Sequence, residues 1–218
     1  MTATARIGLL GGSFDPPHLA HLALGRVALQ ALALDELRWL PAGAPWQKAG
    51  RLLAPAEHRV AMLAALLADE ARCVIDPREL HRAGPTFTID TVRELQAETP
   101  DADWFLIIGQ DQFARFDTWR DWRELMQGLT LAVAGRAGSA PVAPPAVAAL
   151  LAQKTTHVVA LDLPRQDIAA SDIRARVAAG QPVAALVGER VAGYIGQHRL
   201  YQQGNLGTTQ NTQQDTRG

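Results

Sequence analysis

Two histidines three residues apart, His18 and His21, follow a glycine pair and a short apolar run, 7–10. An apolar run, a glycine turn and then an amphipathic stretch predict a strand, a turn and a helix that starts at the histidines. A helix start presents unpaired N–H groups and the positive end of the helix dipole, which together favour anions. The glycines Gly11 and Gly12 let the backbone approach a ligand closely. Imidazoles and N–H groups fixed there can stabilise negative charge that develops on a phosphate.

The two histidines allow two other interpretations. An isolated pair at this spacing is most often two ordinary helix residues, one solvated and one packed, but the glycine turn at a strand end favours a functional role for His18 and His21. A metal site needs ligands beyond two histidines, and the neighbouring sequence offers none, so no metal-binding residue is predicted.

The elements that must position this turn alternate between short apolar runs and amphipathic stretches. This pattern predicts an α/β fold with a doubly wound parallel sheet and crossover helices. We expect strands near 6–10, 36–41, 73–76, 103–108, 129–134 and 157–162. We expect helices near 18–33, 55–70, 88–98, 119–127, 145–153, 171–179 and 188–197. Thr88 and Ser171 are the residue types expected at helix starts, and Thr88 is predicted to be an N-cap.

Composition narrows the class of protein. The chain has 218 residues, of which 48% are apolar, so it can build a substantial core. A formal net charge of −1 argues against a protein that coats nucleic acid or an anionic membrane. Cys73 is the only cysteine, so the chain has no disulfide framework. We expect Cys73 in a buried strand. With no signal-peptide pattern and no membrane-span pattern, we expect a soluble cytoplasmic protein.

The sequence predicts one domain over 1–202. Its last helices, about 165–202, are expected to form a small helical subdomain that covers one side of the site. Residues 203–218 are rich in Gln, Thr, Asn and Gly and are expected to be a disordered tail.

The opening segment, Gly11-Gly12-Ser13-Phe14-Asp15-Pro16-Pro17-His18 with His21, resembles the start of bacterial nicotinate-nucleotide adenylyltransferases, a family of the HxGH nucleotidyltransferase superfamily. Further segments resemble that family in the expected order, at 41–48, 57–63, 79–91, 105–111 with Trp119, and 168–174. The resemblance runs from about Arg6 to Tyr201. It implies a Rossmann-like nucleotidyltransferase fold. The implied reaction transfers the adenylyl group of ATP to nicotinate mononucleotide, with Mg²⁺ accompanying ATP, and gives deamido-NAD and pyrophosphate.

The resemblance also implies a set of site residues. The catalytic residues would be His18, His21 and Arg174. ATP and its phosphates would contact Gly11, Gly12, Ser13, Phe14, Lys48, Gly109, Asp111, Arg136, Ile168 and Ser171. The mononucleotide would contact Gly43, Pro85, Thr86, Phe87 and Trp119.

These assignments agree with the chemistry of the residues. Lys48 and Arg174 are cations suited to phosphates, and the Asp111 carboxylate could hold ribose hydroxyls. The Trp119 ring could stack on a pyridine ring. Backbone N–H groups around Thr86 would suit a carboxylate better than a neutral carboxamide. Alone, most of these residues would be ordinary surface or turn residues, and only their motifs single them out.

The chain departs from the family pattern at four positions. Ala20 replaces the glycine of HxGH, and Trp46 and Gln47 replace a proline and a histidine of the proline-rich loop. Ala169 replaces a serine before the last motif. None of these changes removes a charge that the chemistry needs.

Alternative functions remain at this stage. The acceptor could be another phosphate, such as nicotinamide mononucleotide, phosphopantetheine or FMN, although the segments around Thr86 and Trp119 argue against the last two. The chain could also be a non-catalytic nucleotide sensor, which intact His18, His21 and Arg174 disfavour. A fragment of a class I aminoacyl-tRNA synthetase is discounted because the chain is short and has no KMSKS-like loop. A homo-oligomer is compatible with the sequence.

Overall fold

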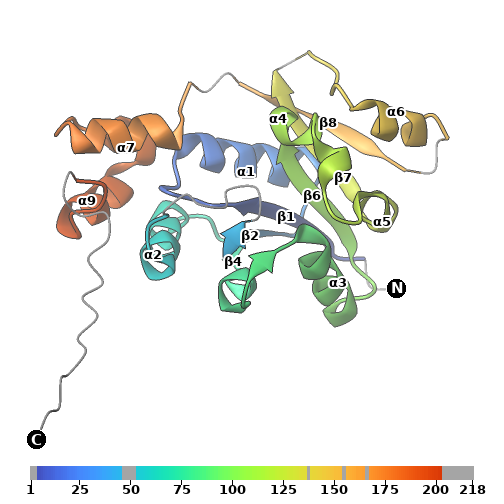
Figure 1. Cartoon of the computed structure of the whole chain (residues 1–218), viewed down its shortest axis with the longest axis horizontal. Coiled ribbons are helices and arrows are strands. Elements are labelled where there is room, and N and C mark those ends of the chain that lie inside the picture. Colours follow the sequence, from blue (N-terminus) through green and yellow to red (C-terminus); the bar gives the residue numbers. More distant parts are fainter. Residues whose placement is uncertain (1–3, 46–52, 137, 154–155, 165–166, 203–218) are drawn as a thin grey trace, which may run out of the picture.

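A six-stranded parallel sheet forms the centre of the protein, in the strand order β4-β2-β1-β6-β7-β8 (Figure 1). The computed structural model describes residues 4–45, 53–136, 138–153, 156–164 and 167–202. The strands are β1 (Arg6–Gly12), β2 (Glu36–Pro41), β4 (Cys73–Ile75), β6 (Asp103–Gly109), β7 (Thr130–Arg136) and β8 (Val158–Leu163). Each lies within two residues of its predicted position, which confirms the doubly wound α/β fold.

The predicted helices are also present, several of them shorter than expected. They are α1 (Leu19–Ala31), α2 (Ala56–Leu66), α3 (Thr88–Glu98), α5 (Trp122–Gly128), α6 (Pro145–Leu151), α7 (Ala170–Ala178) and α9 (Glu189–Gln197). The shortest elements were not predicted: α4 (Gln110–Phe113), α8 (Ala184–Val187), the 3-10 helices η2 (Arg78–His81) and η3 (Phe116–Thr118), and the strand pair β3 (Ala44–Pro45) and β5 (Pro85–Thr86). Elements of two to four residues are too short to show a hydrophobic period.

The strands are continuous apolar runs because both faces of the sheet are buried. Phe105 and Ile107 of β6 join one apolar cluster with residues of α1 and α2, while Leu106 and Ile108 join a second cluster with residues of α3 and α5. Alternate residues of the same strand are therefore buried on opposite faces, as in sheets that helices cover on both sides. Cys73 is an exception to the predicted burial, because it lies half-buried in the edge strand β4.

The caps of two helices differ from the prediction, although α3 begins at Thr88 as expected and α7 begins one residue before Ser171. The N-cap of α3 is Phe87 rather than Thr88, and the N-cap of α7 is Ala169, two residues before Ser171. Phe87 and Ala169 both have extended backbone angles, so the chain is already helical at the residues that prefer capping positions. Ser171 is exposed in the first turn of α7, where its hydroxyl bonds to Asp172 at 3.2 Å. The path of the chain, rather than the capping preference of a side chain, decides where these helices begin.

The order of the strands creates a crevice between β1 and β6. The chain leaves β1 through α1 to β2 on one side, and it returns through α3 to β6 on the other side. In open α/β sheets the carboxyl ends of the two strands at such a reversal are where ligands bind. The turn 13–18, here called the histidine turn, follows β1 directly and ends at His18, and His21 lies in the first turn of α1, so both histidines lie at this crevice.

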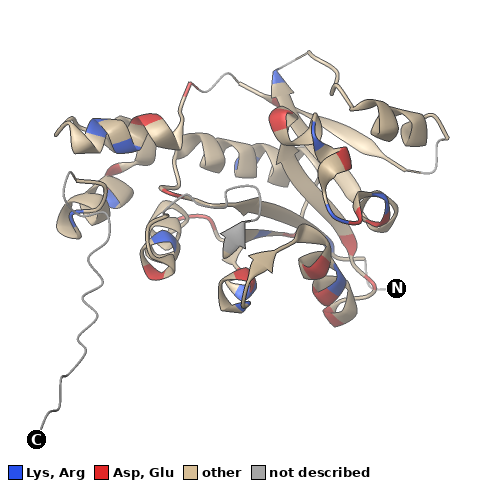
Figure 2. Ribbon diagram, in the orientation of Figure 1, with Lys and Arg blue, Asp and Glu red and all other residues tan. Residues whose placement is uncertain are grey.

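The three helices α7, α8 and α9 lie at one end of the molecule, with α9 beside α2 (Figure 1). The sequence predicts these helices to be a helical subdomain, and the domain bounds stay a prediction. The tail at 203–218 lies outside the described residues. Lys or Arg and Asp or Glu occur together on several helices, such as α3 and α7, whereas α1 is nearly free of charge (Figure 2). Within the described ranges, no helix combines the length and the apolar character that crossing a membrane requires.

Candidate active site

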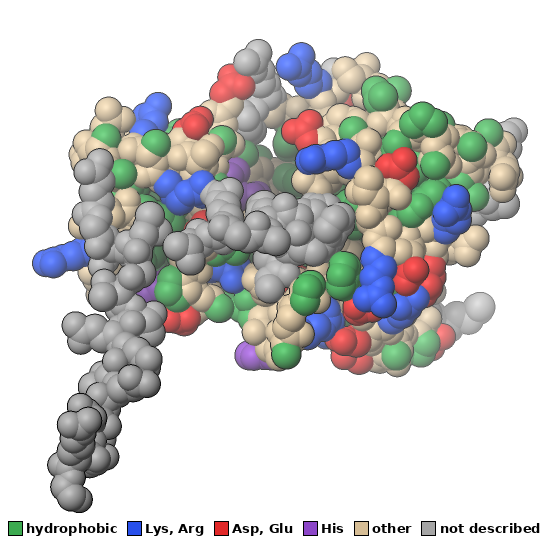
Figure 3. Space-filling view, in the orientation of Figure 1, with side chains coloured by type: hydrophobic (Ala, Val, Ile, Leu, Met, Phe, Trp, Pro, Cys, Tyr) green, Lys and Arg blue, Asp and Glu red, His purple; other side chains and the backbone are tan. Residues whose placement is uncertain are grey.

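A cavity of about 380 Å³ opens at the carboxyl ends of β1 and β6. Figure 3 shows histidine side chains in a hollow at the upper centre of the view. Ten of the predicted site residues line this cavity: Gly11, Gly12, Ser13, Phe14, His18, His21, Thr86, Gly109, Trp119 and Arg174. They come from five separate parts of the chain, so the fold brings together the motifs that the sequence separates.

Seven other predicted site residues that the structure describes do not line the cavity. Pro85, Asp111, Arg136 and Ser171 are exposed, and Gly43, Phe87 and Ile168 are partly buried. Asp111 lies in the first turn of α4, and its neighbour Gln112 faces the cavity instead. Arg136 ends β7, two strands away from β1. Lys48 lies outside the described residues, as do Trp46 and Gln47.

His18 and His21 lie against one another at the start of α1. Their ring centroids are 3.7 Å apart and the ring planes are 26° apart, so the two imidazoles are stacked. The backbone N–H of His18 donates to Nδ1 of His21 at 3.2 Å. In the neutral His21 ring the proton is therefore on Nε2. Burial lowers the pKa of His18 from 6.5 to about 4, so this ring is neutral at pH 7 in the free protein.

Two cavity residues have buried polar atoms without a hydrogen-bond partner among the described residues. These atoms are Nδ1 of His18 and the indole Nε1 of Trp119. Buried polar atoms in proteins are normally paired, and each exception calls for an explanation. Both residues line the cavity, but the two atoms have almost no accessible surface, so a ligand would reach them only if neighbouring groups moved.

The turn after β1 has a tightly determined shape. Phe14 adopts a positive φ of 48°, and its side chain is 2% exposed. A Cβ on Gly12 would lie 2.9 Å from the Phe14 ring, so glycine is required at this position. The Phe14 ring also contacts His21 edge-on, with 5.2 Å between the ring centroids. The Phe14 ring thus packs against the His21 imidazole, which lines the cavity.

Arg174 reaches the same turn from α7. Its Nη1 donates to the backbone carbonyl of Asp15 and lies 3.7 Å from Oδ2 of the Asp15 carboxylate. Its side chain stays about a quarter exposed and lines the cavity. The guanidinium can therefore contact an anion in the cavity while it is tied to the turn.

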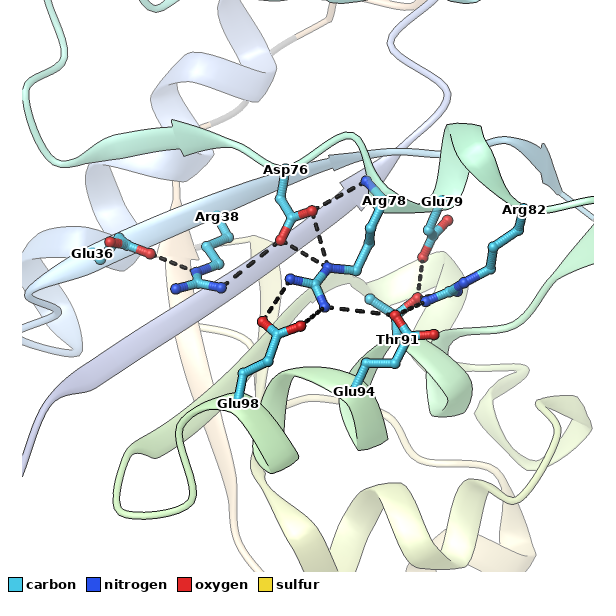
Figure 4. A network of polar contacts seen from close by, with 9 residues as sticks. All are labelled: Glu36, Arg38, Asp76, Arg78, Glu79, Arg82, Thr91, Glu94 and Glu98. Atoms are coloured by element: carbon cyan, nitrogen blue, oxygen red, sulfur yellow. Dashed lines mark hydrogen bonds and ion pairs between the residues drawn. The ribbon is translucent and has the colours of Figure 1, made fainter.

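Glu79 forms part of the cavity wall on the side of Thr86. Its carboxylate accepts a hydrogen bond from the Thr91 hydroxyl at 2.8 Å, and Thr91 in turn accepts one from Arg82 at 2.6 Å (Figure 4). The Thr86 side chain also bonds to this carboxylate. Burial raises the pKa of Glu79, although the two threonine bonds partly oppose the shift.

Gly43 packs against the same segment. A Cβ at Gly43 would overlap the backbone carbonyl oxygen of Glu79 and come within 3.2 Å of the Thr86 side chain. The segment after β2 and the strand β5 are therefore in close contact, with β3 and β5 paired in a small parallel sheet. This contact explains the glycine without requiring it to touch a ligand.

Sequence reasoning missed several residues of the cavity. Asp15, Glu79, Thr88, Gln112 and Ala170 line it, although the predicted site did not include them. Asp15 and Glu79 fall within the segments that resemble the family, and that was the only signal for them. Gln112 could not be chosen over Asp111 without the four-residue helix α4, whose turn decides which residue faces inward.

No group of three or more His, Cys, Asp or Glu side chains with metal-binding geometry occurs among the residues that the structure describes. Asp15, the carboxylate of the histidine turn, is occupied by bonds to protein groups. Mg²⁺ commonly binds through substrate phosphates with few protein ligands, so these residues fit a metal that arrives with a nucleotide.

The fold and the cavity define a class of protein. Residues 9–176 match the family model described as cytidylyltransferase-like. The Plasmodium falciparum nicotinic acid mononucleotide adenylyltransferase complexed with NaAD superposes with a TM-score of 0.72. That match covers 90% of this chain and 97% of the other at 16% identity, which supports the fold alone.

Relatives with higher sequence identity show which family within this class the chain belongs to. A probable nicotinate-nucleotide adenylyltransferase of Methylibium petroleiphilum is 48% identical over 90% of this chain and 92% of its own length. One from Bordetella petrii is 47% identical over 90% of this chain and 98% of its own length. One from Symbiobacterium thermophilum is 40% identical over 92% of this chain and 97% of its own length. The chain therefore belongs to the nicotinate-nucleotide adenylyltransferase family.

Proposed function

We propose that this chain transfers the adenylyl group of ATP to nicotinate mononucleotide, giving deamido-NAD and pyrophosphate in NAD biosynthesis. The observation that carries the proposal is the single cavity wall shared by His18, His21 and Arg174 with Thr86 and Trp119. The first three groups suit phosphates, and the last two suit an aromatic ring with a polar substituent.

The reaction is an in-line displacement at the α-phosphorus of ATP. A phosphate oxygen of the mononucleotide forms a bond to the α-phosphorus, and the bond from that phosphorus to the oxygen leading to the β-phosphate breaks. The electron pair leaves with pyrophosphate. Because the attacking phosphate is already an anion, no protein group needs to act as a covalent nucleophile. The protein contributes position and charge stabilisation.

His21 is the proposed donor to the α-phosphate. Its Nδ1 accepts the backbone N–H of His18, so its Nε2–H is the group that can donate to a phosphate oxygen. His18 would bind the same phosphates, and an anion beside it would raise its low pKa toward the usual value. Arg174, held by the Asp15 carbonyl, would bind the departing pyrophosphate.

The turn and the surrounding segments would complete the ATP site. Backbone N–H groups at Gly11, Gly12, Ser13 and Phe14 would face the phosphates. Mg²⁺ would enter with ATP and neutralise the phosphate tail. Lys48, Gly109, Asp111, Arg136, Ile168 and Ser171 remain proposed contacts of ATP on the strength of their motifs.

Thr86 and Trp119 would hold the pyridine ring of the acceptor. Trp119 lines the cavity, and its ring would stack on the pyridine ring. Gly43, Pro85 and Phe87 would shape this end of the cavity from behind.

Pyrophosphate release from ATP tests the proposal, with nicotinate mononucleotide and nicotinamide mononucleotide compared as acceptors. We expect release with both and a higher kcat/KM with the acid. No release with either acceptor would favour a nucleotide sensor, and faster turnover with the amide would reverse the choice of substrate.

A further inference from the structure

Asp15 is a buried carboxylate at the centre of the histidine turn, and it is 4% exposed. Its Oδ1 accepts hydrogen bonds from the Tyr201 hydroxyl at 2.8 Å and from the backbone N–H of Ala54 at 3.2 Å. Its Oδ2 lies 3.7 Å from Nη1 of Arg174. Three parts of the chain thus meet at one carboxylate that touches the cavity.

Tyr201 supplies the bond that comes from farthest along the chain, 186 residues from Asp15. It follows α9 in a left-handed conformation with φ 61°, which directs the chain back toward the turn. Burial and the Asp15 charge both raise the pKa of Tyr201, so its hydroxyl stays protonated and remains a donor. A buried carboxylate needs such donors, because removing one leaves charge uncompensated in a poorly solvated site.

Arg59 braces the same region from α2. Its guanidinium is 3% exposed and donates to three carbonyls: Ser13 at 2.9 Å, Ala42 at 2.9 Å and Ala54 at 3.0 Å. The Ala54 residue is therefore held on both sides, its N–H by Asp15 and its carbonyl by Arg59. The Asp15 carboxylate is thus held on one side by a segment that Arg59 fixes, while Tyr201 contacts it from the segment after α9 and Arg174 from α7.

Tyr201 and Arg174 compete for the charge of one carboxylate. With the Tyr201 hydroxyl in place, Arg174 stands 3.7 Å from Oδ2 and keeps a side chain that reaches the cavity. If that hydroxyl were lost, the Asp15 charge would be compensated mainly by Arg174, which could shorten its ion pair and turn away from the cavity. A small displacement of a group that stabilises the transition state has a large effect on rate.

We infer that Tyr201 is a positioning residue of the active site, which satisfies Asp15 and so leaves Arg174 directed at the phosphates. The inference rests on the proposed adenylyl transfer. It assigns a part in the reaction to the segment after α9, which lies beyond residue 176, where the family model match ends.

The test compares Tyr201→Phe with Tyr194→Phe. Tyr194 is a matched control because its hydroxyl is also bonded, to His58 Nδ1 at 2.9 Å, but it lies on α9 outside the cavity. We expect Tyr201→Phe to lower kcat by on the order of tenfold with an unchanged KM for the mononucleotide. Tyr194→Phe should keep the kcat of the unmodified protein. Assays well below both melting temperatures separate this effect from a loss of folded protein.

A double-mutant cycle with Arg174→Lys tests whether Tyr201 acts through Arg174. If Tyr201 acts through Arg174, the loss caused by Tyr201→Phe shrinks to less than threefold in the Arg174→Lys background, because coupled residues are not additive. An unchanged kcat in Tyr201→Phe, an equal loss in Tyr194→Phe, or full additivity with Arg174→Lys would each overturn the inference. Should Tyr201→Phe unfold under assay conditions, the test moves to an Asp15→Asn background, where no carboxylate charge draws Arg174 away and Tyr201→Phe should cost less than threefold in kcat. An unmodified protein that releases no pyrophosphate would instead overturn the proposed function.

Discussion

The backbone N–H of His18 donates to Nδ1 of His21, and the two rings are stacked with 3.7 Å between their centroids. One histidine thus fixes the tautomer of the other, and the proton of neutral His21 is placed on Nε2. The two imidazoles form one unit whose members have different roles, although they look equivalent in the sequence.

Replacing His21 tests the proposed donor. We expect His21→Ala to lower kcat for pyrophosphate release by on the order of a hundredfold or more, because a positioned donor to the transition-state phosphate is lost. His58→Ala is the control, since His58 bonds to Tyr194 and does not line the cavity. An unchanged kcat in His21→Ala would contradict the role given to this residue.

The low pKa of His18 predicts how stability depends on pH. The folded protein binds a proton at His18 only near pH 4, whereas the unfolded chain does so near 6.5. Between these values the unfolded state holds more protons, so the free energy of unfolding falls as the pH falls. The loss that His18 contributes should reach about 3 kcal/mol at pH 4.

Urea unfolding at pH 7, 5.5 and 4 measures this effect. His18→Gln, which cannot titrate, is the comparison, and it should lose much less stability than the unmodified protein over the same range. Parallel curves for the two proteins would show that His18 is not the group responsible.

The contact between Gly43 and Glu79 makes a third prediction. In Gly43→Ala the new methyl group would overlap the Glu79 carbonyl, so the segment from η2 to β5 must shift. We expect a loss of about 1–3 kcal/mol in stability and a raised KM for the mononucleotide. Gly193→Ala is the control, because nothing lies within 4 Å of a Cβ there and the site is inside α9. This control should be neutral or slightly stabilising.

Glu79 should matter for the acceptor rather than for ATP. In Glu79→Gln the side chain has one acceptor oxygen and an NH2 group where the carboxylate has two acceptor oxygens, so one of Thr86 and Thr91 can no longer donate to it and must accept instead. We expect KM for the mononucleotide to rise by about tenfold while KM for ATP stays the same. Glu94→Gln is the matched control, since Glu94 binds Arg82 from the exposed side at 2.6 Å. Equal effects of the two substitutions on KM would mean that Glu79 has no special role.

Much of this architecture could be predicted because it depends on local patterns. Buried parallel strands are apolar runs, and the inward stripes of α2 and α3 are visible as Met62 with Leu63 and as Ile89 with Val92. Thr88 is the first residue of α3 rather than its N-cap, and α7 begins one residue before Ser171, because capping preference is a weaker influence than the path of the chain. Trp119 was expected inside a helix, but it follows η3 and precedes α5, where its ring reaches the cavity.

The parts that could not be predicted depend on distant contacts. The bond from Tyr201 to Asp15 joins residues 186 apart, and no period or spacing indicates it. The burial of His18, which lowers its pKa, results from how segments pack around the turn. Sequence motifs identified many residues of the site. The protonation states of these residues, and the side chains that hold them in place, could be read only from the packed structure.

The sheet order also has a consequence for how the protein reaches its folded state. β1 pairs with β6, and Arg6 and Asp103 at one end of this pairing are 97 residues apart. Pairings across such separations form slowly, because the intervening chain must first be ordered. While the chain is being synthesised, the histidine turn therefore exists long before the strand that completes its crevice. A ribosome-bound chain that ends before β6 should have no nucleotide cavity, however well its first two strands are formed.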